Sequence, residues 1–253
     1  MAQSYHYKTL IDSRDVDGHG QCRASALLGH MQEAATQAAE HGGFGREIIM
    51  GRHNGFWMLT RMWYQIKRPL RWNEELTVHT WHRGVKGAVS YRDYDLYIGD
   101  EWVGEGVSAW VLANADTHKL IRLSSVTEMA ETHGGDLRKE KTLNKLKVPT
   151  ELDCIERRMM RYSDTDINGH VNNTRYADFV CDALRMDKLP MERFLAEVQI
   201  GYLKECHPGE VLDICTGICE DGRTYLCGQD EEGLSRFDAA IVFGEIEKEK
   251  NDV

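Results

Sequence analysis

Apolar and polar residues form three successive patterns at the start of the chain. Residues 5–12 alternate loosely and predict a strand, and a polar, glycine-rich turn follows over residues 13–20. The next apolar positions are spaced as on one face of a helix: Ala24, Leu27, Leu28, Met31, Ala35 and Ala38. This spacing predicts a long amphipathic helix. The pair Gly42-Gly43 is typical of the residues that end one.

A strand-rich block follows from about residue 56 to residue 123. Its β-branched, aromatic and roughly alternating segments cover residues 57–68, 75–83, 88–98 and 102–114. Gly99-Asp100 predicts a hairpin turn between the last two segments. The first segment carries apolar residues at both odd and even positions, so we expect that strand to be buried on both faces.

The pattern restarts after a charged stretch with little apolar periodicity, which reads as a linker. A short strand is expected near residues 156–162, followed by a second polar turn and by a helix that begins at Asn172 or Asn173 as N-cap. The apolar positions of that helix are Ala177, Val180, Cys181 and Leu184. Four further strands are expected at residues 196–204, 211–219, 223–229 and 237–245. The expected units are residues 1–124, a linker over 125–150, residues 151–247 and a polar tail over 248–253.

The order of strand, polar turn, helix and antiparallel strands therefore occurs twice. Residues 66–78 align without gaps on residues 202–214, and Asp15-Val16-Asp17 aligns on Asp164-Thr165-Asp166. A lone helix laid across a curved antiparallel sheet buries one face of each element. Two such units can pair their sheets into one longer sheet.

The two copies differ in the polar residues that chemistry would use. Residues 164–173 of the second copy hold two carboxylates, three carboxamides and one imidazole. The aligned pairs are Asn168 with His19, His170 with Gln21, Glu205 with Pro69, and Cys206 with Leu70. Residues needed only for caps and turns would be kept about equally in both copies. The difference therefore indicates a duplicated fold with one surviving active site.

Composition and charge argue against several classes of protein. The chain has 253 residues and a formal net charge of −10, which disfavours non-specific nucleic-acid binding. No apolar run approaches the roughly 18 residues of a membrane span, and the N-terminus lacks the features of a targeting peptide, so we expect a cytosolic protein. Seven cysteines without a paired spacing suggest reduced thiols. A zinc set is not expected, because the spacing of Cys206, His207, Cys215 and Cys219 fits no common structural-zinc pattern.

The run DTDINGHVNNTRYADFV at residues 164–180, followed by YLKEC at residues 202–206, resembles the acyl-ACP thioesterases, double hot-dog enzymes of fatty-acid synthesis. Residues 57–81 resemble the N-terminal hot-dog of that family, and the likeness extends roughly from residue 7 to residue 243. It implies an α+β tandem hot-dog fold, with two long helices each packed on a curved antiparallel sheet and the two sheets paired into one. The short N-terminus suggests a bacterial-type member.

The resemblance also implies a reaction and a site. The family's catalytic positions carry over to Asp166, Asn168, His170, Glu205 and Cys206, and all of them match. The implied reaction is hydrolysis of the thioester that joins a fatty acyl chain to the phosphopantetheine arm of acyl carrier protein. That arm belongs to the substrate, so no cofactor and no metal is implied. The N-terminal unit would hold the acyl-chain pocket beside its degenerate site, and the C-terminal unit would hold the catalytic residues.

Each residue type suits a step of this reaction. An imidazole is the usual general base at neutral pH, which assigns that role to His170. Asn168 can donate to the oxyanion or hold a water, Asp166 can orient a neighbour, and backbone amides at the helix start can complete the oxyanion hole.

Two mechanisms remain open at this point. Glu205 and Cys206 are adjacent on a predicted strand, so their side chains point to opposite faces. An inward Cys206 would form a nucleophilic triad with His170 and Asn168. An inward Glu205 would instead activate water beside His170, and this second route is favoured.

Two alternative functions, the role of three arginines and the oligomeric state are left open by the sequence. The same fold can serve an acyl-CoA thioesterase or a non-catalytic acyl-binding protein. Arg157, Arg158 and Arg161 are either a solvated edge or a docking site for acidic carrier protein. The chain is expected to be a monomer or a homodimer, since two hot-dogs in one chain supply the sheet pairing that single hot-dogs obtain by dimerising.

Overall fold

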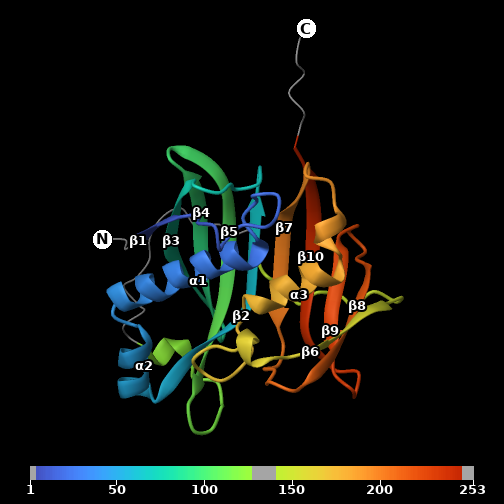
Figure 1. The fold of residues 1–253 in the computed structure, drawn as a ribbon. Helices are drawn as coiled ribbons and strands as arrows, with labels where there is room; N and C mark the ends of the chain where they lie inside the picture. Colours follow the sequence, from blue (N-terminus) through green and yellow to red (C-terminus); the bar gives the residue numbers. More distant parts are fainter. Residues whose placement is uncertain (1–3, 127–140, 247–253) are drawn as a thin grey trace.

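One antiparallel sheet of ten strands forms the centre of the molecule, in the order β1-β3-β4-β5-β2-β7-β10-β9-β8-β6 (Figure 1). The computed structural model describes residues 4–126 and 141–246. The strands are β1 (Ser4–Leu10), β2 (Gly55–Ile66), β3 (Glu75–Lys86), β4 (Val89–Ile98), β5 (Glu101–Asn114), β6 (Asp153–Met159), β7 (Arg193–Tyr202), β8 (Val211–Ile218), β9 (Thr224–Gln229) and β10 (Ser235–Glu245). The helices are α1 (Ala24–His41), α2 (Arg46–His53) and α3 (Arg175–Ala183), with short 3₁₀ turns η1 (Leu123–Ser125), η3 (Tyr162–Asp164) and η4 (Met186–Lys188).

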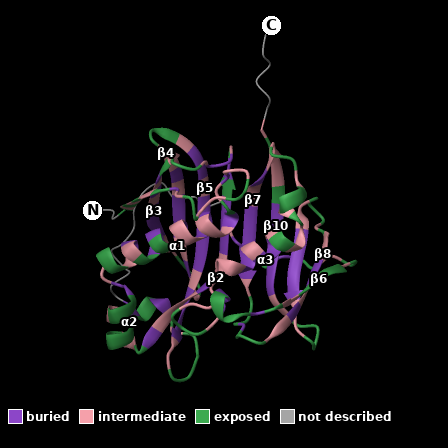
Figure 2. Cartoon of the chain, viewed as in Figure 1, coloured by how far each residue is buried: buried purple, intermediate pink, exposed green. Residues whose placement is uncertain are grey.

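The two halves of the chain meet where β2 pairs with β7, so that Tyr64 lies opposite Val198. The expected pairing of two sheets into one is confirmed. Helices α1 and α3 lie across the same face of the sheet, one over each half (Figure 1). Their buried side chains form a single apolar cluster with the strands beneath them. Figure 2 shows the buried residues concentrated in the strands behind these helices.

The first helix has the expected length and the expected buried stripe, and it ends at the C-cap Gly42. The second helix differs from the expectation, because it begins at Arg175 and has only 9 residues. Its N-cap is Thr174 rather than Asn172 or Asn173. Asn172 Oδ1 accepts hydrogen bonds from Thr174 N at 2.9 Å and from Thr174 Oγ1 at 2.8 Å. The side chain of Asn172 thus stabilises a turn that precedes the helix.

Part of the expected linker packs against the other face of the sheet. Leu143 belongs to an apolar cluster with Trp63, Val107 and Ala109, whereas the neighbours of Trp63 in β2 face the helices. Gln199 Nε2 donates to the backbone oxygen of Asn144 at 3.1 Å. Residues 141–149 have no helix or strand but cover the sheet. Residues 127–140 of the expected linker and the expected tail at 248–253 lie outside the described residues.

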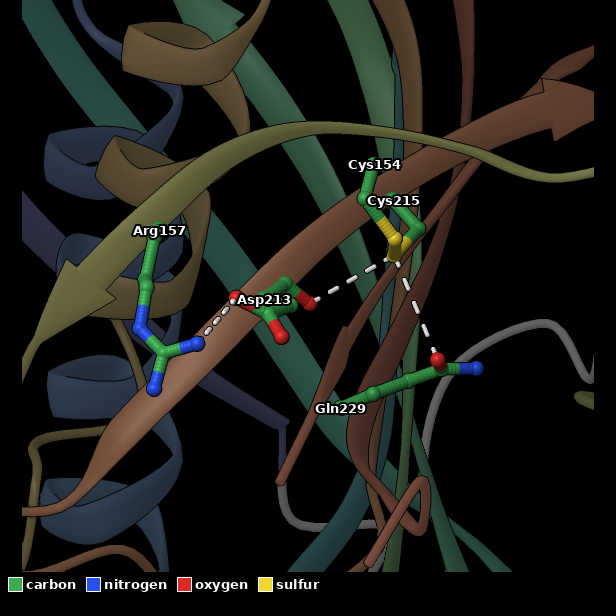
Figure 3. Close-up of a disulfide and its surroundings, with 5 residues drawn as sticks. All are labelled: Cys154, Arg157, Asp213, Cys215 and Gln229. Carbon is green, nitrogen blue, oxygen red and sulfur yellow. Dashed lines mark hydrogen bonds and ion pairs between the residues drawn. A yellow bond between two sulfur atoms is a disulfide. The ribbon is translucent and has the colours of Figure 1, made fainter. Parts of the chain in front are cut away.

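The expectation that all cysteines are reduced is wrong for one pair. Cys154 of β6 and Cys215 of β8 are partners in the strand register and form a disulfide, with their Cα atoms 3.8 Å apart (Figure 3). The two residues are separated by 61 positions in the sequence, and only the pairing of β6 with β8 brings them together. The spacing of the cysteines in the sequence therefore gives no indication of this disulfide. The other described cysteines are free thiols: Cys22, Cys181, Cys206, Cys219 and Cys227.

Reduction of this disulfide is expected to lower the free energy of unfolding by about 2–4 kcal/mol, because the bond restricts the unfolded chain. Urea denaturation with and without dithiothreitol measures the difference. Cys154→Ser should remove the dependence on reductant, whereas Cys219→Ser, which alters a free thiol, should keep it. Peptide mapping that finds Cys154 and Cys215 both open to alkylation without reductant would contradict the assignment.

Candidate active site

The two polar turns share one backbone conformation. In the second half, Asp166 N donates to His170 O at 2.9 Å, and in the first half Asp17 N donates to Gln21 O at the same distance. Gly169 and Gly20 occupy equivalent places with φ of 77° and 67°, in the left-handed region that favours glycine. The repeat inferred from the sequence is therefore also a structural repeat, and the aligned pairs can be compared directly.

A second shared hydrogen bond places the loop after the central strand beside each turn. Val171 N donates to Cys206 O at 2.9 Å, and its counterpart in the first half is the bond from Cys22 N to Leu70 O at 2.8 Å. In the second half, this bond brings the Glu205-Cys206 pair next to His170. The fold thus joins two segments that are far apart in the sequence.

His170 and Glu205 form the polar contact of the site. His170 Nε2 lies 3.4 Å from Glu205 Oε2, and the two side chains are 32% and 44% exposed. The ring of His207 stands nearly perpendicular to that of His170, with the ring centroids 4.8 Å apart. Solvent and a bound substrate can therefore reach the imidazole. The first half has Gln21, Pro69 and Arg71 at these positions, and none of them offers a base.

Asp166 and Asn168 form a second pair on the same turn. Asp166 Oδ1 accepts a hydrogen bond from Asn168 N at 2.8 Å, and Asp166 Oδ2 accepts one from Asn168 Nδ2 at 3.5 Å. Asn168 is exposed. The carboxylate of Asp166 thus holds the turn and the carboxamide of Asn168 in place, and its orienting role in a reaction stays a prediction.

Cys206 has a different environment from Glu205. It is completely buried in the apolar cluster beneath the helices. Burial raises the pKa of its thiol, with the Tyr176 hydroxyl acting in the opposite direction. A buried, protonated thiol is a poor nucleophile. The pair lies in the loop after β7, which ends at Tyr202, and not on a strand as expected. The two side chains nevertheless point in opposite directions, Glu205 toward solvent and Cys206 into the core.

Arg236 positions the loop that carries Glu205, a role that is not apparent from the sequence. Its Nη1 donates to the backbone oxygen of Glu205 at 3.0 Å and lies 3.8 Å from Glu210 Oε2. Its Nε donates to Asp230 Oδ2 at 2.8 Å, and its side chain is 13% exposed. Arg236 therefore holds the loop that carries Glu205. An arginine in a strand gives no sequence signal for this role.

Asp164 has the structural role that its position on a turn suggests. It is 3% exposed. One carboxylate oxygen accepts a hydrogen bond from Arg161 N at 2.8 Å, and the other lies 3.2 Å from Arg175 Nη2. The carboxylate thus closes the 3₁₀ turn η3 and ties it to the start of α3.

Two of the three arginines that precede the site, Arg157 and Arg158, favour the solvated-edge interpretation. Arg157 lies 3.5 Å from both Asp213 and Glu231. Arg158 lies 2.7 Å from Asp182 and stacks on the ring of Phe179. These two charges are therefore already paired within the chain.

Two helix-on-sheet units that share one sheet, with a polar turn fitted for chemistry in only one of them, define a tandem hot-dog protein. The family model for the acyl-ACP thioesterase N-terminal domain matches residues 2–129, and the model for the C-terminal domain of the same family matches residues 149–248. The chain belongs to the acyl-ACP thioesterase family.

Two relatives carry names that agree with this assignment. An acyl-[acyl-carrier-protein] hydrolase (FATB2, chloroplastic) of Cuphea viscosissima is 26% identical over 96% of this chain and 60% of its own length. A dodecanoyl-[acyl-carrier-protein] hydrolase of Cinnamomum camphora is 28% identical over 83% of this chain and 56% of its own length. The chain thus spans about 60% of the length of the first of these relatives and less of the second.

The solved structures cover the whole tandem arrangement. The crystal structure of an acyl-ACP thioesterase from Bacteroides thetaiotaomicron has a TM-score of 0.83 and 22% identity, and covers 95% of this chain and 98% of its own. The 12:0-ACP thioesterase from Umbellularia californica has a TM-score of 0.79 and 21% identity, and covers 96% and 98%. These likenesses confirm the fold. Within residues 4–126 and 141–246, no helix is long and apolar enough to cross a membrane.

Proposed function

We propose that this protein hydrolyses the thioester of fatty acyl carrier protein to free fatty acid and carrier protein, and so ends chain extension. The observation that carries the proposal is the contact between His170 Nε2 and Glu205 Oε2 at 3.4 Å, next to the Asp166–Asn168 pair. Only the second half of a duplicated fold holds this set. Membership of the acyl-ACP thioesterase family supports the choice of substrate class.

In the proposed mechanism, a water that hydrogen-bonds to both Glu205 and His170 attacks the thioester carbonyl while this pair takes its proton. Asn168, fixed by Asp166, donates to the oxygen on which negative charge develops. Collapse of the tetrahedral intermediate breaks the carbon–sulfur bond. The proton then passes to the phosphopantetheine sulfur, and the acyl group leaves as the free acid. Burial of Cys206 favours this route over a covalent acyl-enzyme.

The N-terminal unit, residues 1–124, is proposed to hold the acyl chain, and the C-terminal unit, residues 151–247, to supply the catalytic residues. The apolar contact between α1 and the first half of the sheet supports this division. Met31 is completely buried there and lies so close to Gly106 that a Cβ at that glycine would clash with its terminal methyl. An unbranched thioether of this kind can move aside for a chain more readily than a branched side chain.

Comparison of kcat/KM for an acyl carrier protein thioester and for the matching acyl-CoA tests the proposed substrate. Both substrates present the same phosphopantetheine arm and differ in what lies beyond it. A preference for the carrier-protein thioester is expected. A preference for acyl-CoA would overturn the proposal in favour of an acyl-CoA thioesterase. The fatty acids released when the protein is expressed in a bacterium would give the chain length. A cytosolic location remains a prediction.

A further inference from the structure

Three side chains that can bind a metal ion converge at the catalytic turn. His170, Glu205 and His207 each offer one ligand atom, and these atoms all lie within 4.8 Å of one another. His170 is half-buried, whereas Glu205 and His207 are exposed. In the sequence, the spacing of His207 with Cys206, Cys215 and Cys219 fits no common structural-zinc pattern. The structure gives this histidine different neighbours, an imidazole and a carboxylate.

This combination is a known zinc ligand set, since two histidines and one glutamate hold zinc in several enzymes. Zinc binds these ligands at roughly 2.0–2.2 Å, so tetrahedral geometry places two ligand atoms about 3.3–3.5 Å apart. His170 Nε2 and Glu205 Oε2 are 3.4 Å apart and already meet this condition. The ligand atom of His207 lies within 4.8 Å of the other two, so this exposed side chain has to move closer to complete the set.

The backbone around His207 is held in place without that side chain. His207 N donates to Glu210 Oε2 at 3.1 Å, and Arg236 contacts both Glu210 and the backbone oxygen of Glu205. The loop is therefore partly organised before any ion arrives. At the equivalent place in the first half, Arg71 Nη1 donates to the backbone oxygen of His19 at 3.1 Å. An arginine cannot bind a cation, so the ligand set belongs to the second half alone.

We propose that His170, Glu205 and His207 form an inhibitory binding site for a divalent transition-metal ion, for which Zn²⁺ fits best. The inhibition rests on the proposed function. A bound ion takes the Nε2 lone pair of His170 and one oxygen of Glu205, so neither group can accept the proton of the attacking water. His207 supplies the third ligand and takes no part in hydrolysis.

Calorimetric titration of the full chain with Zn²⁺, after removal of metal by a chelator, measures the binding. One Zn²⁺ is expected to bind with an affinity that falls at least roughly tenfold in His207→Asn. His118→Asn is the matched control, because His118 is exposed, lies away from the site and has a φ of 55° that asparagine tolerates. It should bind Zn²⁺ as the unchanged protein does. Equal affinity in all three proteins would overturn the proposal, since binding would then belong to another set of ligands.

Hydrolysis measured on the same samples separates this inference from the proposed function. Each rate is normalised to the zinc-free rate of the same variant. Zn²⁺ should slow acyl-ACP hydrolysis, a chelator should restore it, and His207→Asn should raise the half-inhibitory concentration at least roughly tenfold. Stimulation of hydrolysis by Zn²⁺ would overturn the inhibitory site. Zinc-free protein without hydrolysis, but with binding that depends on His207, would overturn the proposed function and leave the metal site standing.

Discussion

His170→Ala is expected to lower kcat/KM for acyl-ACP hydrolysis by at least roughly a hundredfold, because the variant loses the base that accepts the proton of the attacking water. The loss should appear in kcat rather than in KM, since the imidazole acts on the water and not on the acyl chain. His170 is half-buried on a turn whose bonds run through the backbone. The fold should therefore survive the change, and thermal denaturation can check this.

His19→Ala is the matched control, because His19 occupies the place of Asn168 in the degenerate turn of the first half. It removes an imidazole from the same turn conformation and should leave kcat/KM within about twofold. If His170→Ala left any measured hydrolysis unchanged, that hydrolysis would not depend on this site, which is the result that the non-catalytic acyl-binding alternative predicts.

Glu205→Gln is expected to reduce kcat by roughly 10²–10⁴, whereas Cys206→Ala should keep most of the activity. The difference follows from the geometry, because Glu205 lies 3.4 Å from His170 and Cys206 is completely buried. Steady-state kinetics of both variants with one acyl-ACP substrate measures the contrast. The loss of a buried sulfur should appear in the free energy of unfolding, by roughly 0.5–3 kcal/mol.

The covalent route predicts that Cys206→Ala loses more activity than Glu205→Gln. In that case Cys206→Ala would be inactive, and rapid quenching of the unchanged protein followed by mass spectrometry would detect an acyl group on Cys206. Since Cys206→Ala can lose activity by unfolding, the comparison is valid only for protein whose thermal transition remains cooperative. Near-normal turnover by folded Cys206→Ala would exclude the nucleophilic triad.

Much of the fold can be predicted from the sequence, because each half repeats the same alternation of period-2 and period-3.6 segments. The gap-free alignment of residues 66–78 on 202–214 also predicts which positions correspond. The short length of α3 could not be predicted in the same way. Its apolar stripe continues to Leu184, but Asn172 stabilises a turn with Thr174 and delays the helix start.

The candidate site is predictable to the extent that it lies within one continuous run. The run from Asp166 to His170 and the pair Glu205-Cys206 are visible in the sequence, and the opposite directions of that pair were inferred, although from a strand that is absent. The role of Arg236 became visible only in the structure, because this residue reaches the site through strand pairing that no periodicity or spacing records. The contact of His207 with His170 was also found only in the structure, although His207 directly follows Cys206 in the sequence. The disulfide between Cys154 and Cys215 could not be predicted either, because only the pairing of β6 with β8 brings the two residues together.

Gln21 occupies the place of His170 in the first half, and it is 5% exposed. Its Nε2 donates to the backbone oxygens of Met191 at 2.8 Å and of Arg193 at 3.4 Å, both in the second half. The turn of the first half thus joins the two halves through these hydrogen bonds. In the variant Gln21→His, these hydrogen bonds to the second half would be lost before the imidazole could act as a base. The divergence of the two halves is therefore hard to reverse by single substitutions, since the turn without a base now helps to join the two halves.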